Sequence, residues 1–338
     1  MKENYMITQN GFYIRFGIYL LLIILFQILF MSCSQQKEEK KISIGISHWV
    51  SNPEFGNNLQ GFKEGLAEKG YIEGKNIEFV IRNPKADKEK QHEIINEFIE
   101  LKVDLIYSLT TPGTLIAKSL TNKIPIVFSI VTYPVEAGVI ESLTRSNNNL
   151  VGTRNYIQPS RQFLLFRKIS PDVKTIAIVH RKGEPNSTIQ YNEFKKLLNA
   201  NDIDVIDIAG TDKADIHNQL ELNKEKIDAV YSTNDTLIQS GGEEVVIAFC
   251  NKNNKISFSG NKDGVLKGAL AGNVADFYTI GKMSGTKAGL ILNGAMPSSL
   301  LTESPVEDYI IINTKTSEKI DLKISQLILK DAKKIVRK

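Results

Sequence analysis

The side chains of this sequence that are suited to binding a solute are hydroxyls, amides and a few acids that follow predicted strands. They stand where a short β-branched run ends and a helical pattern begins. Together with helix N-terminal amides, such groups can hold a small polar or zwitterionic solute by directed hydrogen bonds. The candidates are Ser47, Thr110, Thr111, Thr132, Glu184, Asn186, Ser187, Asn234, Asp235 and Asn261. The alternative is that each of them only caps the helix that follows it.

Catalytic and metal-binding motifs are absent from the sequence. It has no GxSxG elbow, no P-loop GxxxxGK, no GxGxxG after the first strand and no HxxxH or HExxH among its four histidines. Cys250 lies in the apolar run EEVVIAFC, which indicates a buried helix cysteine rather than a nucleophile. Glu184 and Asp235 could form an acid/base pair, but a sequence does not give their separation. We therefore expect no enzyme activity, no metal site and no cofactor.

Composition and charge are those of a globular protein. The 338 residues are enough for two domains, and the formal net charge of +4 is spread along the chain without a block of like charges. This distribution gives no electrostatic footprint for nucleic acid, so we expect no nucleic-acid partner. The two cysteines, Cys33 and Cys250, lie in very different settings, which argues against a disulfide framework.

Strand-like and helix-like segments alternate from residue 41 onward, which predicts parallel sheets covered by helices. A first unit has predicted strands at 41–47, 76–82, 103–109 and 124–130, with helices near 58–69, 87–101 and 114–120. The pattern restarts after the polar patch 146–149, with predicted strands at 149–156, 175–180, 204–209, 228–233 and 255–260. The expected fold class is α/β, with two doubly wound parallel-sheet lobes around a cleft. Open parallel sheets bind ligands outside the carboxyl ends of their strands, so the cleft is the candidate site.

The N-terminus has the layout of an export signal. Lys2 and Arg15 precede an uncharged apolar run at 16–31, which is shorter than the ~20 residues that cross a bilayer comfortably. Ser32 and Cys33 follow at once and resemble the lipobox of bacterial lipoproteins, although Phe30 and Met31 depart from its usual residues. We expect a signal peptide at 1–32, lipidation of Cys33 and a polar tether at 33–41. A permanent transmembrane helix is the alternative.

Several segments of the body resemble a known family. They are GFKEGLAEKGYIEGKNIEF at 61–79, VDLIYSLTTP at 103–112, IPIVFSIVTYPVEAGVI at 124–140, NNLVGT at 148–153 and GEPNS at 183–187. These segments are similar to those of the substrate-binding lipoproteins of bacterial ABC importers, in particular the group that binds tryptophan and other aromatic amino acids. The GYIEGKN stretch is the sharpest of these signals.

The resemblance implies a type I periplasmic-binding-protein fold, in which the chain crosses between two lobes three times. The crossings are expected near 152–156, 275–278 and 302–306. The first lobe would then contain residues 42–154 and 277–303, and the second lobe residues 155–276 and 304–338.

The resemblance also implies that the ligand contacts fall on the strand-end residues already named. The family usually has Asp followed by Asn where this chain has Asn234 and Asp235. We therefore expect Asp235 to bind the ammonium of an amino acid, with Asn234 and Asn186 as neighbours, and Glu184 as the alternative source of the charge. If Asp235 is instead a helix cap, its loss would affect stability rather than affinity.

These observations predict an extracytoplasmic lipoprotein that captures a small polar solute, such as an amino acid and possibly aromatic, and delivers it to an ABC permease driven by its ATPase subunit. It would be attached to the membrane through its lipid, at the outer face of the cytoplasmic membrane or in the periplasm. Two other classes of protein fit the same features. One is a sensor subunit that signals ligand occupancy, and the other is a lipoprotein hydrolase.

Overall fold

The computed structural model describes residues 41–51, 53–307 and 309–337. The predicted signal peptide, the lipidation site Cys33 and nearly all of the predicted tether lie outside this range. Within it, no helix is both long enough and apolar enough to span a bilayer.

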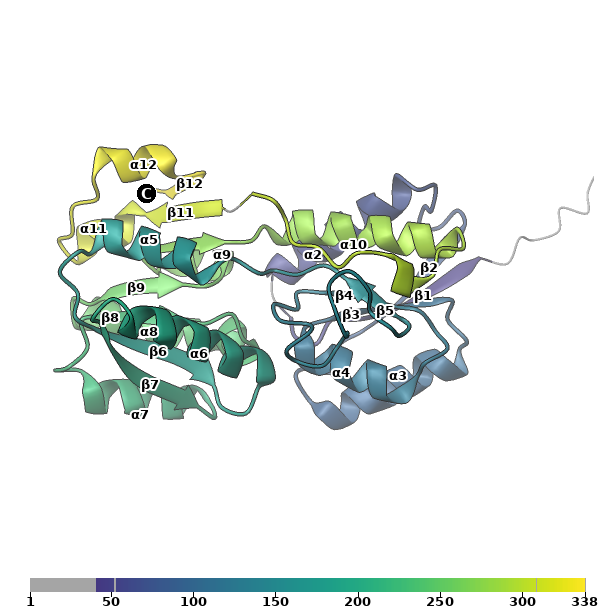
Figure 1. Cartoon of the computed structure of the whole chain (residues 1–338), viewed down its shortest axis with the longest axis horizontal. Helices are drawn as coiled ribbons and strands as arrows, with labels where there is room; N and C mark the ends of the chain where they lie inside the picture. The colour runs from purple at the N-terminus through teal and green to yellow at the C-terminus, as the bar shows by residue number, and fades with distance from the viewer. Residues whose placement is uncertain (1–40, 52, 308, 338) are drawn as a thin grey trace, which may run out of the picture. The chain divides into compact units, whose positions relative to one another are not determined.

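The first sheet of the described chain has five parallel strands in the order β2-β1-β3-β4-β5. Its strands and the helices between them are β1 (Ile42–Ser47), α2 (Pro53–Ala67), β2 (Ile77–Arg82), α3 (Lys88–Glu100), β3 (Leu105–Leu109), α4 (Thr111–Leu120), β4 (Ile126–Ser129) and β5 (Leu150–Gly152). The helix α10 (Phe277–Leu292) also packs on this sheet (Figure 1). We call this sheet with α2, α3, α4 and α10 the first lobe.

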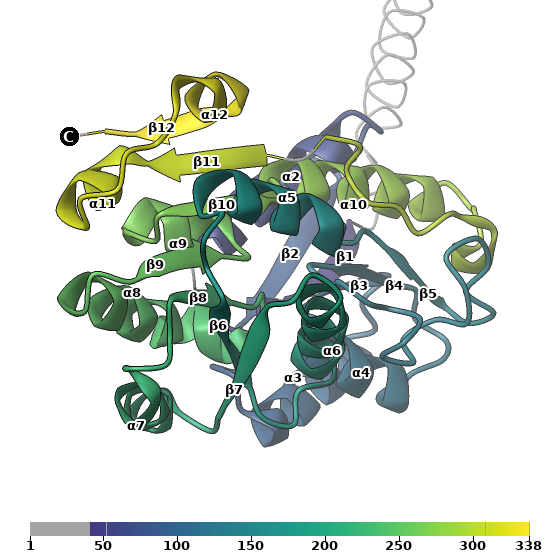
Figure 2. The same cartoon turned by 60° about the vertical axis from the view of Figure 1, so that its left-hand side comes forward.

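The second sheet has seven strands among the described residues, in the order β12-β11-β10-β9-β8-β6-β7. Its elements are α5 (Pro159–Ile169), β6 (Thr175–Arg181), α6 (Pro185–Asn199), β7 (Asp204–Gly210), α7 (Lys213–Asn223), β8 (Ala229–Ser232), η1 (Ile238–Gly242), α8 (Glu243–Lys252), β9 (Ile256–Ser259), α9 (Lys262–Lys267), β10 (Ala271–Val274), β11 (Tyr309–Asn313), α11 (Thr314–Lys319), α12 (Gln326–Asp331) and β12 (Lys334–Val336). Only β10 and β11 pair antiparallel within this part of the chain. We call these elements the second lobe, seen from another side in Figure 2.

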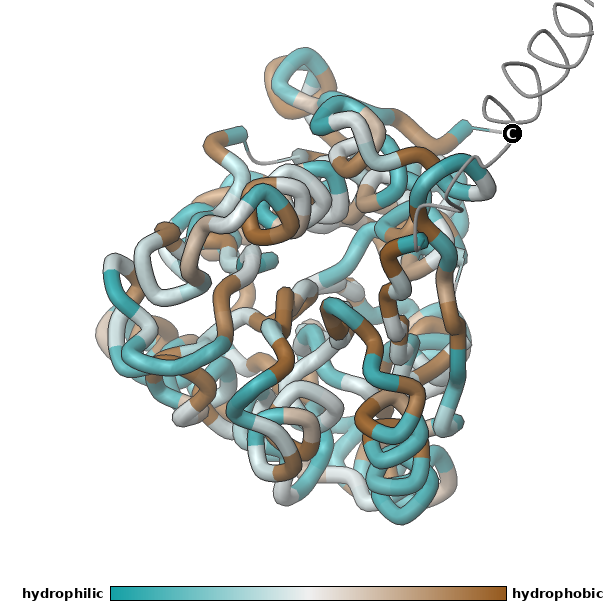
Figure 3. Tube along the Cα trace, turned by 90° about the vertical axis from the view of Figure 1, so that its right-hand side faces the viewer, coloured by the Kyte–Doolittle hydropathy of each residue, from teal (hydrophilic) through white to brown (hydrophobic). Residues whose placement is uncertain are grey.

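Each sheet is covered on both faces, which explains why its strands read as continuous apolar runs. In β6, Ile176 and Ile178 pack toward α5 and α6, whereas Ala177 and Val179 pack toward α7 and α8. Hydrophobic and hydrophilic residues alternate along the helices, as the colours of the tube in Figure 3 show. This pattern is expected because one side of each helix faces a sheet and the other faces solvent. The predicted fold class, two doubly wound α/β lobes, is confirmed.

Two details of the sequence interpretation are wrong. The segment 149–156 does not open the second unit, because β5 pairs with β4 at the edge of the first sheet, where all three of its residues are buried. A polar loop before a strand therefore did not mark a change of lobe. The helix predicted at 58–69 begins earlier, at Pro53, because proline is well suited to a first turn and the polar residues that follow obscured the helical period.

The chain passes between the sheets after β5, after β10 and before β11, and two of these passages are bonded to each other. Thr153 forms a parallel bridge with Glu303, and the Arg154 amide donates to the Glu303 carbonyl at 2.8 Å. The Thr153 hydroxyl donates to the Ile280 carbonyl of α10 at 3.1 Å. The connecting segments are thus attached to α10.

Helices α2 and α10 pack backbone against backbone, although they are about 220 residues apart in the chain (Figure 1). Four glycines make this contact. A Cβ added at Gly61 or Gly65 would lie 2.1 or 2.2 Å from a carbonyl oxygen of α10, and one added at Gly281 or Gly285 would lie 1.9 or 2.1 Å from a carbonyl oxygen of α2. Only glycine fits at these four positions, because the obstructing atoms are main-chain atoms.

We expect Gly281→Ala to lower the free energy of unfolding by about 3 kcal/mol or more, because the new methyl group collides with the Asn58 carbonyl. The matched control is Gly56→Ala, an exposed position of α2 with no atom within 4 Å of the added Cβ. The control should raise the free energy of unfolding by about 0.5–1 kcal/mol. Urea denaturation measures both, and a loss below about 1 kcal/mol for Gly281→Ala would contradict the close packing.

Candidate functional site

A cavity of about 330 Å³ lies between the two lobes, at the carboxyl ends of several strands. Its size suits a small organic molecule. The first lobe contributes Trp49, Ala86, Lys88, Pro112, Leu115 and Ile116, and the second contributes residues 181–185 and Thr236. Three of the lining side chains are cations, Lys88, Arg181 and Lys182, and one is an acid, Glu184.

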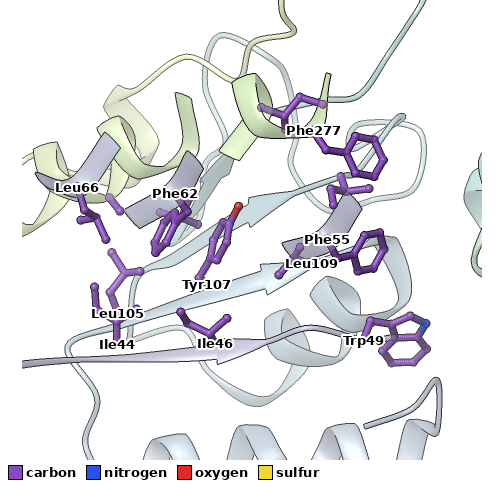
Figure 4. Close-up of a cluster of buried hydrophobic side chains, with 14 of the residues drawn as sticks. Ile44, Ile46, Trp49, Phe55, Phe62, Leu66, Leu105, Tyr107, Leu109 and Phe277 are labelled. Atoms are coloured by element: carbon purple, nitrogen blue, oxygen red, sulfur yellow. The ribbon is translucent and has the colours of Figure 1, made fainter. Parts of the chain in front are cut away.

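The first lobe has an aromatic ring in the cavity wall, Trp49, and two buried polar atoms, at Trp49 and at Thr110 near the lining residue Pro112, that have no partner among the described residues. Trp49 follows β1 with φ of 56°, and its ring lies at the carboxyl end of that strand (Figure 4). The Trp49 Nε1 and the Thr110 hydroxyl are buried, and neither has a hydrogen-bond partner among the described residues. Thr110 stands at the N-cap of α4 with φ of 71°, but its side chain does not cap the helix. A buried polar atom left unpaired costs about 1–3 kcal/mol, so these atoms are suited to a ligand.

The other first-lobe candidates have partners within the protein or lie in a helix. The Ser47 hydroxyl donates to Gln91 Oε1 at 2.6 Å and so points toward α3. The Thr132 hydroxyl donates to Asn155 Oδ1 at 2.9 Å. Thr111 is the buried first residue of α4. Of the four first-lobe candidates, Thr110 is the one whose hydroxyl is both buried and unpaired.

A network of buried amides lies next to the lining residues of the second lobe in the chain. Asn186 Nδ2 donates to the Asn234 carbonyl at 3.2 Å, and Gln239 Nε2 donates to Asn234 Oδ1 at 2.8 Å. The Asn234 amide donates to Gln190 Oε1 at 2.9 Å. These side chains are buried, and Asn186 Oδ1 has no partner in the described part of the chain. The network therefore fixes the position of Asn186 and leaves its acceptor available.

The sequence interpretation did not identify the residues that bond to this amide network from within the second lobe. Gln190 Nε2 donates to Tyr231 Oη at 2.9 Å, and that hydroxyl donates to Gln162 Oε1 at 3.0 Å. Gln190 could have been found, because it lies four residues after Asn186 on the same face of α6. Gln239 could not, because it approaches Asn234 through the irregular turn of η1, where Gly241 has φ of 117°.

Ser187, Asp235 and Asn261 have structural partners. Ser187 Oγ donates to the carbonyls of Arg181 and Glu184, at 2.6 and 3.0 Å. Asn261 caps α9 by accepting from the Gly264 amide at 2.8 Å, and its Nδ2 donates to Glu243 Oε2 at 3.1 Å. These bonds are within the second lobe and need no ligand.

The buried Asp235 carboxylate accepts three hydrogen bonds from the protein. The donors are the Ile238 amide at 2.9 Å, the Arg181 amide at 2.6 Å and the Thr233 hydroxyl at 2.8 Å. The bond from Ile238, three residues later, is the bond that a capping aspartate makes. This geometry favours the capping alternative for Asp235.

Comparison with known proteins decides the family. Residues 43–336 match the model of the ABC transporter substrate-binding protein family. The chain belongs to this family. It is 31% identical over 285 residues to the tyrosine-binding protein of Clostridioides difficile strain R20291, covering 84% of this chain and 82% of that protein.

Two solved structures of similar fold cover 88% of this substrate-binding protein and 100% of their own chains. One is a conserved domain protein from Vibrio cholerae, with 27% identity and a TM-score of 0.84. The other is the ABC domain in complex with L-Trp from Streptococcus pneumonia, with 24% identity and a TM-score of 0.84. Family membership gives this chain an extracytoplasmic place, a small-molecule ligand and an ABC permease as partner.

Burial raises the pKa of four carboxyl groups of the substrate-binding protein, Glu54, Glu184, Asp235 and Glu243, and Glu184 and Glu243 are raised to about 7. Burial, together with the negative charge of Asp235, raises the pKa of Glu184 to about 7, although Thr236 Oγ1 donates to its Oε2 at 2.5 Å. Burial also raises the pKa of Glu243 to about 7, although Ser259 and Asn261 donate to it. Both groups therefore hold a proton more readily in the folded state than in the unfolded state.

We expect Glu243→Gln to remove part of the pH dependence of stability. Because the folded pKa of Glu243 lies above the unfolded value of 4.5, its contribution is complete below pH 4.5 and is lost as pH rises through about 7. The wild-type melting temperature should thus fall more than that of Glu243→Gln between pH 5 and pH 8. Thermal unfolding across this range measures the difference, and parallel curves would show that Glu243 is ionised throughout.

We expect Asp235→Ala to lower the free energy of unfolding by about 2 kcal/mol or more, because three buried donors lose their acceptor. Melting temperature and ligand affinity should be measured together for Asp235→Ala and Asp235→Asn. A tenfold or greater loss of affinity in Asp235→Asn at unchanged melting temperature would instead assign the ligand's ammonium to Asp235.

Proposed function

We propose that this substrate-binding protein captures an amino acid, of the aromatic class, in the cavity between its lobes and delivers it to the permease without chemical change. The observation that carries the proposal is a set of buried polar atoms without a partner among the described residues: Trp49 Nε1, Thr110 Oγ1 and Asn186 Oδ1. Trp49 lines the cavity, and Thr110 and Asn186 lie within two residues of the lining residues Pro112 and Pro185 in the chain. Two similar proteins support the ligand class: the tyrosine-binding protein of Clostridioides difficile, and the ABC domain from Streptococcus pneumonia that was solved in complex with L-Trp.

The cavity combines the surfaces that an aromatic amino acid needs. The Trp49 ring and the apolar side chains of Pro112, Leu115, Ile116 and Pro185 suit a flat ring. The unpaired donor and acceptor atoms suit the polar end of the ligand. Glu184 lines the same cavity and is the acid that we assign to the ammonium, since the three donors around Asp235 belong to the protein.

Ligand binding would hold the lobes together, because the ligand contacts come from both. Contacts between the lobes already exist: Tyr133 Oη donates to Glu193 Oε2 of α6 at 2.5 Å, and Lys262 of α9 lies 3.4 Å from Glu54 of α2. A ligand that contacts both walls has greater affinity for the closed arrangement, and this difference drives closure.

A transport role without catalysis fits the remaining groups of the described chain. The Cys250 thiol is buried in α8, and its burial raises its pKa, which disfavours the reactive thiolate. For the segment before residue 41 we propose cleavage before Cys33 and lipidation of its thiol, which the mass of the mature protein would test.

We expect aromatic amino acids to raise the melting temperature of the soluble body, because a ligand that binds only the native state stabilises it. Thr110→Val and Asn186→Ala should each weaken binding about tenfold. Thr110→Val should leave the ligand-free protein as stable as before or more stable, since its hydroxyl has no partner to lose.

The matched control is Thr114→Val in the same helix, where the hydroxyl donates to Ser108 Oγ at 3.2 Å. This variant should lose stability and keep its affinity. No thermal response to any aromatic amino acid would refute the ligand class, and equal affinities in Thr110→Val and Thr114→Val would remove Thr110 from the site.

A further inference from the structure

Arg181 is a cation of the cavity wall that forms no salt bridge with the described residues, although it lies close enough to the Glu184 carboxyl to lower the pKa of that group. It ends β6, and its side chain lines the cavity between the lobes. Its Nη1 donates to Thr236 Oγ1 at 3.0 Å, and within the described residues no carboxylate lies at ion-pair distance from its guanidinium. Guanidinium has five N–H donors, so most of them are left for another group.

The position of Arg181 is fixed from two sides. Its amide donates to Asp235 Oδ2 at 2.6 Å, which holds the backbone at the end of β6. Thr236 Oγ1 accepts from its side chain and itself donates to Glu184 Oε2 at 2.5 Å. The guanidinium and the Glu184 carboxyl are therefore held on the same wall, on either side of one hydroxyl.

The two lysines of the same cavity differ from Arg181 in their surroundings. Lys88 and Lys182 are exposed, whereas Arg181 is partly buried. An exposed ammonium remains hydrated, but a partly buried, planar guanidinium can bind a carboxylate through two parallel hydrogen bonds. Arg181 is thus the cation best suited to direct contact with an anionic ligand group.

We propose that Arg181 binds a carboxylate of the ligand and so makes this protein specific for carboxylate-bearing solutes. The inference rests on the proposed function, because it takes the cavity as the ligand site. For an aromatic amino acid, the α-carboxylate would bind Arg181 and the ammonium would bind Glu184, with one pole of the zwitterion on each side of Thr236.

The test compares compounds that differ only in their charged groups. L-tyrosine, L-tyrosinamide and 3-(4-hydroxyphenyl)propionate are titrated calorimetrically into wild type, Arg181→Gln, Arg181→Lys and the control Arg145→Gln, an exposed arginine of the first lobe. In wild type, L-tyrosinamide should bind at least tenfold more weakly than L-tyrosine. Arg181→Gln should lower the affinity for L-tyrosine at least tenfold and change the affinity for L-tyrosinamide less than threefold. Arg181→Lys should restore part of the lost affinity for L-tyrosine, and the control should bind each compound as tightly as wild type does.

The outcomes separate the two proposals. Equal wild-type affinities for L-tyrosine and its amide, or an equal loss of both in Arg181→Gln, would overturn the role of Arg181 and leave the proposed function standing. If L-tyrosine and the other aromatic amino acids fail to bind, but the propionate binds wild type and not Arg181→Gln, the carboxylate site stands and the ligand class is wrong. Binding of none of the three compounds would refute both.

Discussion

The backbone contact between α2 and α10 is the constraint on which the rest of the structure depends. Helix α10 follows β10 of the second lobe, yet it packs against the first lobe through Gly281 and Gly285. The core of the first lobe is therefore complete only after the chain has passed through most of the second lobe. The connecting segments are attached to the same helix, since Thr153 bonds to Ile280 and Lys287 of α10 pairs with Glu303 at 2.5 Å. The helix that completes one lobe thus also fixes the connections to the other.

This contact also determines where the first-lobe wall of the site lies. Asn58, whose carbonyl is approached by Gly281, donates from Nδ2 to Ser129 Oγ and to the Phe277 carbonyl, both at 3.0 Å, and accepts from Tyr107 Oη at 2.6 Å. Tyr107 stacks on Phe62 of α2 with a centroid distance of 3.7 Å, and both rings lie in the core shown in Figure 4. The Asn58 side-chain amide therefore connects α2, α10, β3 and β4. The positions of the residues that follow β3 and β4 depend on these bonds.

The two walls of the cavity are built from different chemistry. The first lobe presents the Trp49 ring, apolar side chains and Lys88, and the buried Thr110 hydroxyl, which has no partner among the described residues, lies two residues before the lining residue Pro112. The second presents Arg181 and Glu184, which both bond to the Thr236 hydroxyl, and the amide network of Asn186 and Asn234 lies next to these residues in the chain. Buried polar atoms without partners lower the stability of a ligand-free protein, and they are retained where a ligand will satisfy them. The distribution suits a ligand with one apolar and one polar end.

The sequence by itself determined the α/β alternation, the bounds of most strands within two residues, and the rule that the site lies at strand ends. It also showed the resemblance to the family. Only the tertiary structure decided which strand-end side chains face the cavity. Ser47 and Thr110 look equivalent in sequence, but the Ser47 hydroxyl bonds to α3, while the chain at Thr110 takes a positive φ and leaves its hydroxyl unpaired. Arg181 lies one residue beyond the predicted strand 175–180 and was not among the candidates, and its proposed role depends on its place in the cavity wall and on its hydrogen bond to Thr236. Side-chain direction and long-range partners depend on contacts between residues far apart in the chain, which local pattern does not encode.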